Sequence, residues 1–203
     1  MTEHLVTSTL TLKKGAKLTL KKVRPNLLEA RVAITWQKAD SKAQSVDVDL
    51  SALMLSANNR IVTDQDFIFY HQQISPEGSV HYLGDNREGS TDGDEGDSEA
   101  INIQLQKVPV RIERILFVVT IDEAAQKRLN FGKAKNLVAR LFDNVSGEEI
   151  ARWPMHEDYN NYSAMLMCDL HRNEAGWDYM PIGQGSHGDL ESICRDHGLV
   201  FAS

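Results

Sequence analysis

Apolar and polar residues alternate along most of the chain, which is the pattern expected of β-strands with one buried face. Val32, Ile34 and Trp36 fall on the same side of one such stretch. Because side chains on a strand alternate between two faces, this spacing predicts a core-facing row. Further strands are predicted at 45–55, 66–70, 79–83, 100–105, 114–121, 136–143, 149–153, 164–171 and 177–182.

Two segments have the composition of turns between strands. Leucines alternate with polar residues at 10–12 and again at 18–20, on either side of the lysine-rich, glycine-containing segment 13–17. This pattern predicts a β-hairpin over 10–20. The sequence Asn-Val-Ser-Gly at 144–147 separates two predicted strands, and it predicts a second hairpin.

Helical signals are few. Residues 122–130 begin with acids and end with bases, and residues 186–197 place apolar side chains three or four positions apart before Gly198. Many short strands with two minor helices are typical of two packed sheets. The sequence therefore predicts a single domain over residues 1–203, a mostly-β sandwich of two mainly antiparallel sheets.

The charge is concentrated in one segment. The chain has 203 residues and a formal net charge of −7. Residues 84–99 hold seven acids and one base, so this segment alone carries −6 and the rest of the chain only −1. We expect an acidic loop within an otherwise nearly neutral domain.

Composition excludes several classes of protein. The chain has no run of about 18 apolar residues, and its start lacks the pattern of a secretory signal. A sequence pI near 5.5 argues against nucleic acid as a partner. Two cysteines, Cys168 and Cys194, exclude a disulfide framework. We expect free thiols and a cytoplasmic location.

The acidic loop is the first candidate site. Asp92, Asp94 and Asp97 are separated by glycines, so the loop can turn sharply and gather carboxylates. Two such charges 4 Å apart repel by about 4 kcal/mol at an effective dielectric constant near 20. A divalent cation with six to eight oxygen ligands would offset that repulsion. The alternative is a solvated loop without a metal.

A second group of acids supports a metal site. Asp47, Asp49 and Ser51 alternate with apolar residues, so they share one face of a predicted strand, and Asp64 and Asp66 follow. The alternative is an ordinary strand with its polar face in water. Oxygen ligands without cysteine or histidine favour Ca²⁺ over zinc or copper. Mg²⁺ stays open.

Other motifs have weaker functional signals. The run at 183–188 matches the glycine spacing of a dinucleotide-binding loop, but that fold needs a further strand and an acid about 20 residues on. We expect a tight turn before the last helix instead. The seven histidines show no zinc-protease spacing, and His171 near Cys168 is expected to be an ordinary strand residue.

In combination and in order, several segments resemble the TerD-domain family of bacterial tellurite-resistance and stress-response proteins. The resemblance covers about residues 8–200. The segments that carry it are Leu-Lys-Lys-Gly at 12–15, Asp-Val-Asp-Leu-Ser-Ala at 47–52, Asp-Gln-Asp-Phe-Ile-Phe-Tyr at 64–70, Ser-Pro-Glu-Gly-Ser-Val at 75–80, Gly-Asp-Asn-Arg at 84–87, Val-Thr-Ile-Asp-Glu-Ala at 119–124, Asn-Phe-Gly at 130–132, Gly-Glu-Glu-Ile-Ala-Arg at 147–152 and Gly-Gln-Gly at 183–185.

The resemblance implies a non-enzymatic, calcium-binding β-sandwich that holds one or two Ca²⁺ ions. It further implies a scaffold or sensor role beside other stress-resistance proteins and a membrane-embedded partner, in the cytoplasm or at the inner face of the membrane. No small-molecule substrate is implied. Carried onto this sequence, the metal positions are Asp47, Asp49, Asp66, Asp85, Asn86, Asp92, Asp94 and Glu99.

Three other functions stay open at the level of sequence. A calcium-dependent membrane-docking module would use the lysines between 13 and 22. A hydrolase would use the acidic cluster with a divalent ion, although no spacing demands a catalytic base. A metal-free interaction protein would bind a basic partner through its acidic loop.

Overall fold

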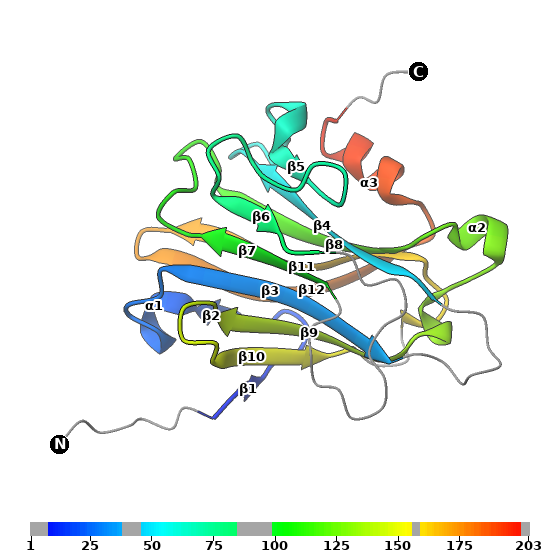
Figure 1. Ribbon diagram of the computed structural model, residues 1–203, viewed down its shortest axis with the longest axis horizontal. Helices are drawn as coiled ribbons and strands as arrows, with labels where there is room; N and C mark the ends of the chain where they lie inside the picture. Colours follow the sequence, from blue (N-terminus) through cyan, green and yellow to red (C-terminus); the bar gives the residue numbers. More distant parts are fainter. Residues whose placement is uncertain (1–7, 38–45, 85–98, 156–158, 200–203) are drawn as a thin grey trace.

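Two six-stranded β-sheets pack face to face in this protein (Figure 1). The structure is a computed structural model that describes residues 8–37, 46–84, 99–155 and 159–199. The strand order is β1-β10-β9-β3-β7-β6 in sheet A and β2-β12-β11-β8-β4-β5 in sheet B. The β1–β10 pair is parallel and the other pairs are antiparallel. The predicted fold class is confirmed.

The strand bounds follow the predicted apolar alternation closely. Sheet A contains β1 (Leu10–Thr11), β3 (Glu29–Gln37), β6 (Val80–Tyr82), β7 (Glu99–Gln104), β9 (Lys135–Asp143) and β10 (Glu149–Pro154). Sheet B contains β2 (Leu18–Thr19), β4 (Val48–Leu55), β5 (Phe67–Ile68), β8 (Arg114–Ile121), β11 (Ala164–Asn173) and β12 (Gly176–Ser186).

The main core lies between the two sheets. Trp36 from β3, Leu50 from β4 and Phe117 from β8 are almost fully buried there. Val46, Val48 and Leu50 belong to this core, so the predicted inward row of that strand is confirmed. Asp47, Asp49 and Ser51 must then alternate onto the outer face of sheet B.

The expected hairpin over 10–20 is wrong. β1 pairs with β10 in sheet A, whereas β2 pairs with β12 in sheet B, so the chain passes from one sheet to the other at this point. The Gly15 N–H donates to the carbonyl of Pro181. Alternation indicates that a segment is a strand, but it does not indicate which strand is its partner. The hairpin at 144–147 is confirmed, with Gly147 at φ +76° between β9 and β10.

The helices are short. They are α1 (Leu20–Val23), α2 (Ala124–Lys127) and α3 (Leu190–Asp196), with two 3-10 turns at Asp64–Asp66 and Phe131–Lys133. α2 is shorter than the predicted 122–130, because Glu123 and Arg128 take left-handed conformations at its two ends. The pattern at 20–23 did not predict α1.

α3 covers part of the outer face of sheet B (Figure 1). Ile193 and Cys194 pack there against Leu53 of β4 and Val118 of β8, forming a second, smaller core. Both cysteines are free thiols, as the sequence predicted, and both are buried. Among the described residues, no helix is long and apolar enough to cross a membrane.

Candidate functional site

Half of the predicted calcium ligands lie in described parts of the chain. Asp47, Asp49, Asp66 and Glu99 have defined surroundings. The other four predicted ligands lie outside the described residues, and they are Asp85, Asn86, Asp92 and Asp94. The geometry of the first four decides what the described structure contributes to a site.

Asp47 and Asp49 stand at the start of β4, where this strand lies beside β8. The Cα of Asp49 is paired in register with that of Thr120. The carbonyl of Asp47 accepts a hydrogen bond of 3.0 Å from the N–H of Asp122, just beyond the end of β8. Both carboxylates are half-buried. The pairing of β4 with β8 therefore brings the 47–49 acids beside those at 122–123.

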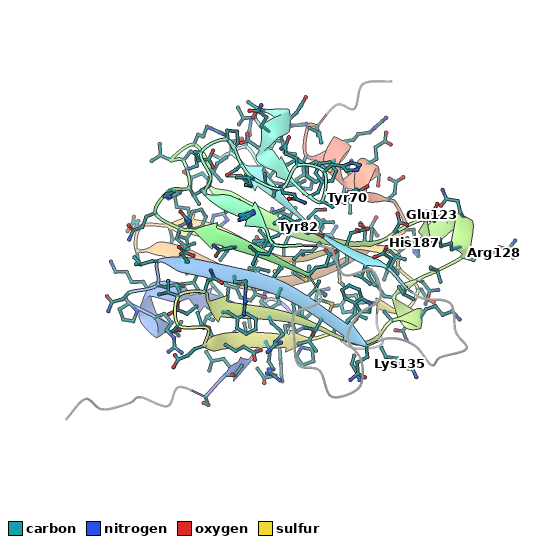
Figure 2. The ribbon with its side chains drawn as sticks, viewed as in Figure 1. Tyr70, Tyr82, Glu123, Arg128, Lys135 and His187 are labelled. Atoms are coloured by element: carbon teal, nitrogen blue, oxygen red, sulfur yellow. The ribbon has the colours of Figure 1, made fainter. Side chains whose placement is uncertain are left out.

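A pocket of about 530 Å³ opens beside Asp49. Its walls come from the ends of β4 and β8, from α2, and from the segment that leads into α3. Figure 2 shows Tyr70, Glu123 and His187 on this side of the molecule. The oxygen-bearing side chains that line the pocket are Asp49, Tyr70, Thr120, Asp122, Glu123, Gln126, Ser163 and Asp189.

Two of these carboxylates have a cationic neighbour. The Lys127 Nζ lies 2.6 Å from a Glu123 oxygen and 3.6 Å from an Asp122 oxygen, so it offsets part of their repulsion. Hydrogen bonding to Glu123 raises the pKa of Lys127 despite an opposing effect of burial. Asp189 caps α3 by accepting the Ser192 N–H at 2.9 Å. The pocket is therefore acidic, and Lys127 already balances part of its negative charge.

Asp66 is held by the protein itself. Its side chain is fully buried, and Arg111 donates to both carboxylate oxygens at 2.7 and 2.8 Å. The Thr63 N–H and hydroxyl also donate to Oδ2, which closes a capping box around the 3-10 turn at Asp64–Asp66. A metal ion would have to displace Arg111 to reach this carboxylate.

Glu99 begins β7 and joins the two sheets. Its Oε2 accepts the N–H of Leu50 at 2.5 Å, and its Oε1 accepts the hydroxyl of Tyr82 at 2.9 Å. The side chain is 1% exposed. Leu50 belongs to sheet B and Tyr82 to sheet A, so this one carboxylate anchors β7 against β4. These two hydrogen bonds therefore fix the first residue of β7 between the sheets.

The described residues do not complete a metal centre by themselves. No group of three or more His, Cys, Asp or Glu side chains within the described ranges is arranged to hold an ion. Asp49 and the pocket supply carboxylate and hydroxyl oxygens, which are the ligand types that Ca²⁺ prefers. The fit to calcium is therefore partial, and it requires oxygens from the predicted ligands that lie outside these ranges.

The glycine run at 183–188 is mostly strand rather than the expected tight turn. Gly183 and Gly185 belong to β12, which continues to Ser186. A Cβ on Gly183 would overlap Tyr159 and Trp153, and one on Gly185 would overlap the ring of Tyr162. The glycines are needed because aromatic side chains pack directly on the backbone of this strand.

Three acids of the pocket were missed as site residues by sequence reasoning. Asp122 and Glu123 were interpreted as the start of a helix, and Asp189 lay within the predicted 186–197 helix. Acids at these positions are a normal helix-capping signal, and one sequence gives no sign that the two helix starts converge. Only the pairing of β8 with β4 and β11 brings these segments together.

The fold and the acidic pocket define a two-sheet β-sandwich with oxygen donors gathered at one end of sheet B. Residues 9–197 match the TerD domain, and the chain belongs to this family. The predicted resemblance is confirmed.

Similar proteins support this family assignment. The chain is 37% identical over 188 residues to a tellurium resistance protein TerD of Serratia marcescens, covering 93% of this chain and 96% of the relative. It is 35% identical over 193 residues to general stress protein 16U of Bacillus subtilis, covering 94% and 98%. A solved structure of a homologue of the telluride resistance protein from Streptomyces coelicolor shares the fold, with a TM-score of 0.65 and 18% identity over 83% of this chain and 96% of that one.

Proposed function

We propose that this protein is a calcium-binding, non-catalytic scaffold or sensor that acts in bacterial tellurium resistance and stress response. The observation that carries the proposal is that Asp49 lines an acidic pocket beside the strand pair β4–β8. The names of the relatives supply the physiological setting. We further propose a cytoplasmic location and protein partners from the same resistance system, one of them membrane-embedded.

The described carboxylates would have two different roles around the ion. Asp47 and Asp49 would supply oxygens from the outer face of sheet B, together with the predicted ligands between 85 and 94. Asp66 and Glu99 already accept hydrogen bonds from the protein, so they would hold the surrounding backbone in place. When bound, Ca²⁺ would supply positive charge that neutralises the gathered acids.

Thermal unfolding with excess calcium and with chelator tests the metal-binding part. Because an ion that binds only the folded state stabilises it by mass action, calcium should raise the midpoint of the wild-type protein. At 100 times the dissociation constant the gain would be about 2.7 kcal/mol. An unchanged midpoint would overturn the calcium proposal.

Two variants locate the ion. Asp49→Asn keeps the side-chain shape but weakens a cation ligand, so it should shrink the calcium-induced shift of the midpoint. Asp196→Asn removes the same charge from the exposed face of α3 and should leave that shift unchanged. Equal effects of the two substitutions would show that overall charge, and not a site at Asp49, is responsible.

Complementation tests the physiological part. The wild-type chain and Asp49→Asn would be expressed in a bacterial strain deleted for its own TerD-domain protein, and growth would be measured against increasing tellurite. We expect the wild-type chain to restore growth and the variant to restore it less. Restoration by neither chain at equal expression would contradict a role in tellurium resistance.

A further inference from the structure

A second pocket of about 300 Å³ lies at the end of the molecule that carries α1. It is enclosed by α1 and the residues after it, by the connection from β7 to β8, and by the turn between β11 and β12. Figure 1 shows α1 beside that turn, and α1 also contacts β12. The lining includes Lys21, Arg24, Leu27, Leu105, Arg172 and Trp177.

The lining has a distinct chemical character. Three of its side chains, Lys21, Arg24 and Arg172, are cationic, and none of the described lining residues is acidic. Leucine, proline and tryptophan side chains supply most of the remaining wall. The pocket beside Asp49 has the opposite composition, with four carboxylates and no lysine or arginine in its described lining. The pocket at α1 therefore favours a ligand that is both apolar and negatively charged.

Arg172 gives this pocket a fixed cation. Its guanidinium stacks 4.3 Å from the centroid of the Trp177 ring. The Nε donates to the carbonyl of Ile112 at 2.9 Å, and Nη2 donates to those of Val108 and Pro109 at 3.2 and 3.1 Å. These partners hold the group rigidly without neutralising it, because all of them are uncharged.

The charge of Arg172 is not balanced by an ion pair with any carboxylate in the described chain. Burial lowers the pKa of its guanidinium, and the charge of Glu113 acts in the opposite direction. A cation that is partly removed from water and has only neutral partners is stabilised when an anion approaches. This observation points to a ligand and not only to structure.

The other two cations differ in how they are held. Arg24 is paired at 3.0 Å with Glu148, whose side chain is 60% exposed. Lys21 is exposed on α1 and makes no ion pair with a described residue. Lys22 is equally exposed on the same short helix but does not line the pocket. Lys21 can therefore turn toward a bound anion, and Lys22 provides a matched comparison.

We propose that this pocket, named here the α1 pocket, binds a small amphipathic anion that has an apolar body and one phosphate or carboxylate group. The apolar body would lie against Leu27, Leu105 and Trp177, while Lys21 and Arg172 would face the anionic group. A volume of 300 Å³ is at the lower end of small-molecule sites, so the bound part is small. Such a group occurs in soluble metabolites and in lipid headgroups.

Phenyl phosphate is a suitable probe because it combines a flat apolar ring with a phosphate. Its binding to the calcium-free protein would be measured by tryptophan fluorescence and by calorimetry. We expect saturable binding that weakens as salt is added. Phenol, which lacks the charge, and inorganic phosphate, which lacks the ring, should each bind more weakly. Equal binding of phenol or of inorganic phosphate would overturn the proposed ligand class.

Two single-charge variants test the location. Lys21→Gln should weaken phenyl phosphate binding about fivefold, which is the loss expected for one partly exposed ion pair. Lys22→Gln should leave the affinity within error of the wild type. Equal losses in the two variants would show that the ligand is attracted by the overall positive charge of α1. That result would overturn the proposal that the α1 pocket is the binding site. No loss in either would do the same.

Vesicles separate the two sources of ligand. Co-sedimentation would be measured with vesicles of phosphatidylserine and of phosphatidylcholine, again without calcium. Binding to phosphatidylserine that Lys21→Gln reduces and Lys22→Gln does not would identify a lipid headgroup. Phenyl phosphate binding without vesicle binding would identify a soluble ligand. Absence of both would overturn the proposal, while the calcium proposal would remain open to its own separate test.

Discussion

Asp49 and Asp66 are both predicted metal ligands, yet their surroundings give them different roles. Asp49 opens into a pocket with three other acids, whereas Asp66 is buried against Arg111 and Thr63. A buried carboxylate with both oxygens bonded to an arginine stabilises the fold only while its partner stays in place. The two residues should therefore respond differently to substitution.

Asp66→Asn should destabilise the protein whether or not calcium is present. The substitution removes the charge that faces Arg111 and weakens the capping box at the 3-10 turn, so we expect a loss of about 2 kcal/mol. Urea unfolding in chelator measures it, with Asp64→Asn as the matched exposed control. Unchanged stability together with a lost calcium response would instead make Asp66 a metal ligand.

Glu149 predicts an acid-sensitive contribution to stability. Burial alone would raise its pKa, but hydrogen bonds from Arg140 and Arg152 outweigh burial and lower the pKa below its usual value. A carboxylate with a lowered folded-state pKa stabilises the protein above its unfolded-state pKa, and this contribution disappears as pH falls through the folded-state pKa.

The stability difference between wild type and Glu149→Gln should therefore be largest near neutral pH. It should shrink as pH falls below about 4.5, where the unfolded-state carboxyl begins to bind protons. Urea unfolding at a series of pH values measures the difference. A difference that stays constant down to pH 3 would show that charge on Glu149 does not contribute.

At the scale of elements, α3 is attached to sheet B by a small apolar contact. Ile193 and Cys194 face Leu53, Leu55, Leu116 and Val118. The helix has only seven residues, and a helix this short depends on packing rather than on its own propensity. Burial raises the pKa of the Cys194 thiol to about 12, which keeps the thiol protonated and unreactive while α3 is docked.

Ile193→Ala should loosen α3 more than it loosens the rest of the fold. Loss of a buried isoleucine costs about 3 kcal/mol in a typical core. Alkylation of Cys194 should become faster while Cys168, inside the main core, stays protected. Arg195→Ala on the exposed side of the same helix is the control. Equal acceleration at both cysteines would indicate global unfolding instead.

Sequence reasoning predicted elements better than it predicted their partners. Period-two alternation located the longer strands, since each buries one face. It failed at 10–20, where Leu10 lies in sheet A and Leu18 lies in sheet B. It also did not predict that Asp122 and Asp189 share a pocket with Asp49, because that proximity depends on strand order. The sequence alone does not distinguish Asp66 from Asp49, because the hydrogen bonds of Asp66 with Arg111 and Thr63 depend on the fold.

At the scale of the whole molecule, acidic and basic side chains are concentrated in different regions. The net charge of −7 comes mostly from 84–99, and the described structure adds an acidic pocket at one end of the sandwich and a cationic pocket at α1. Two bound Ca²⁺ ions would bring four positive charges and leave the protein near −3. The acids would then serve binding and not solubility.

Calcium titration by calorimetry tests the central claim most directly, because it gives stoichiometry and affinity together. We expect saturable binding of one or two ions to the wild-type protein, weaker binding to Asp49→Asn, and wild-type binding to Asp196→Asn. Two results together would contradict the calcium-binding account. The folded wild-type protein would give no saturable heat, and its thermal midpoint would be the same in calcium and in chelator.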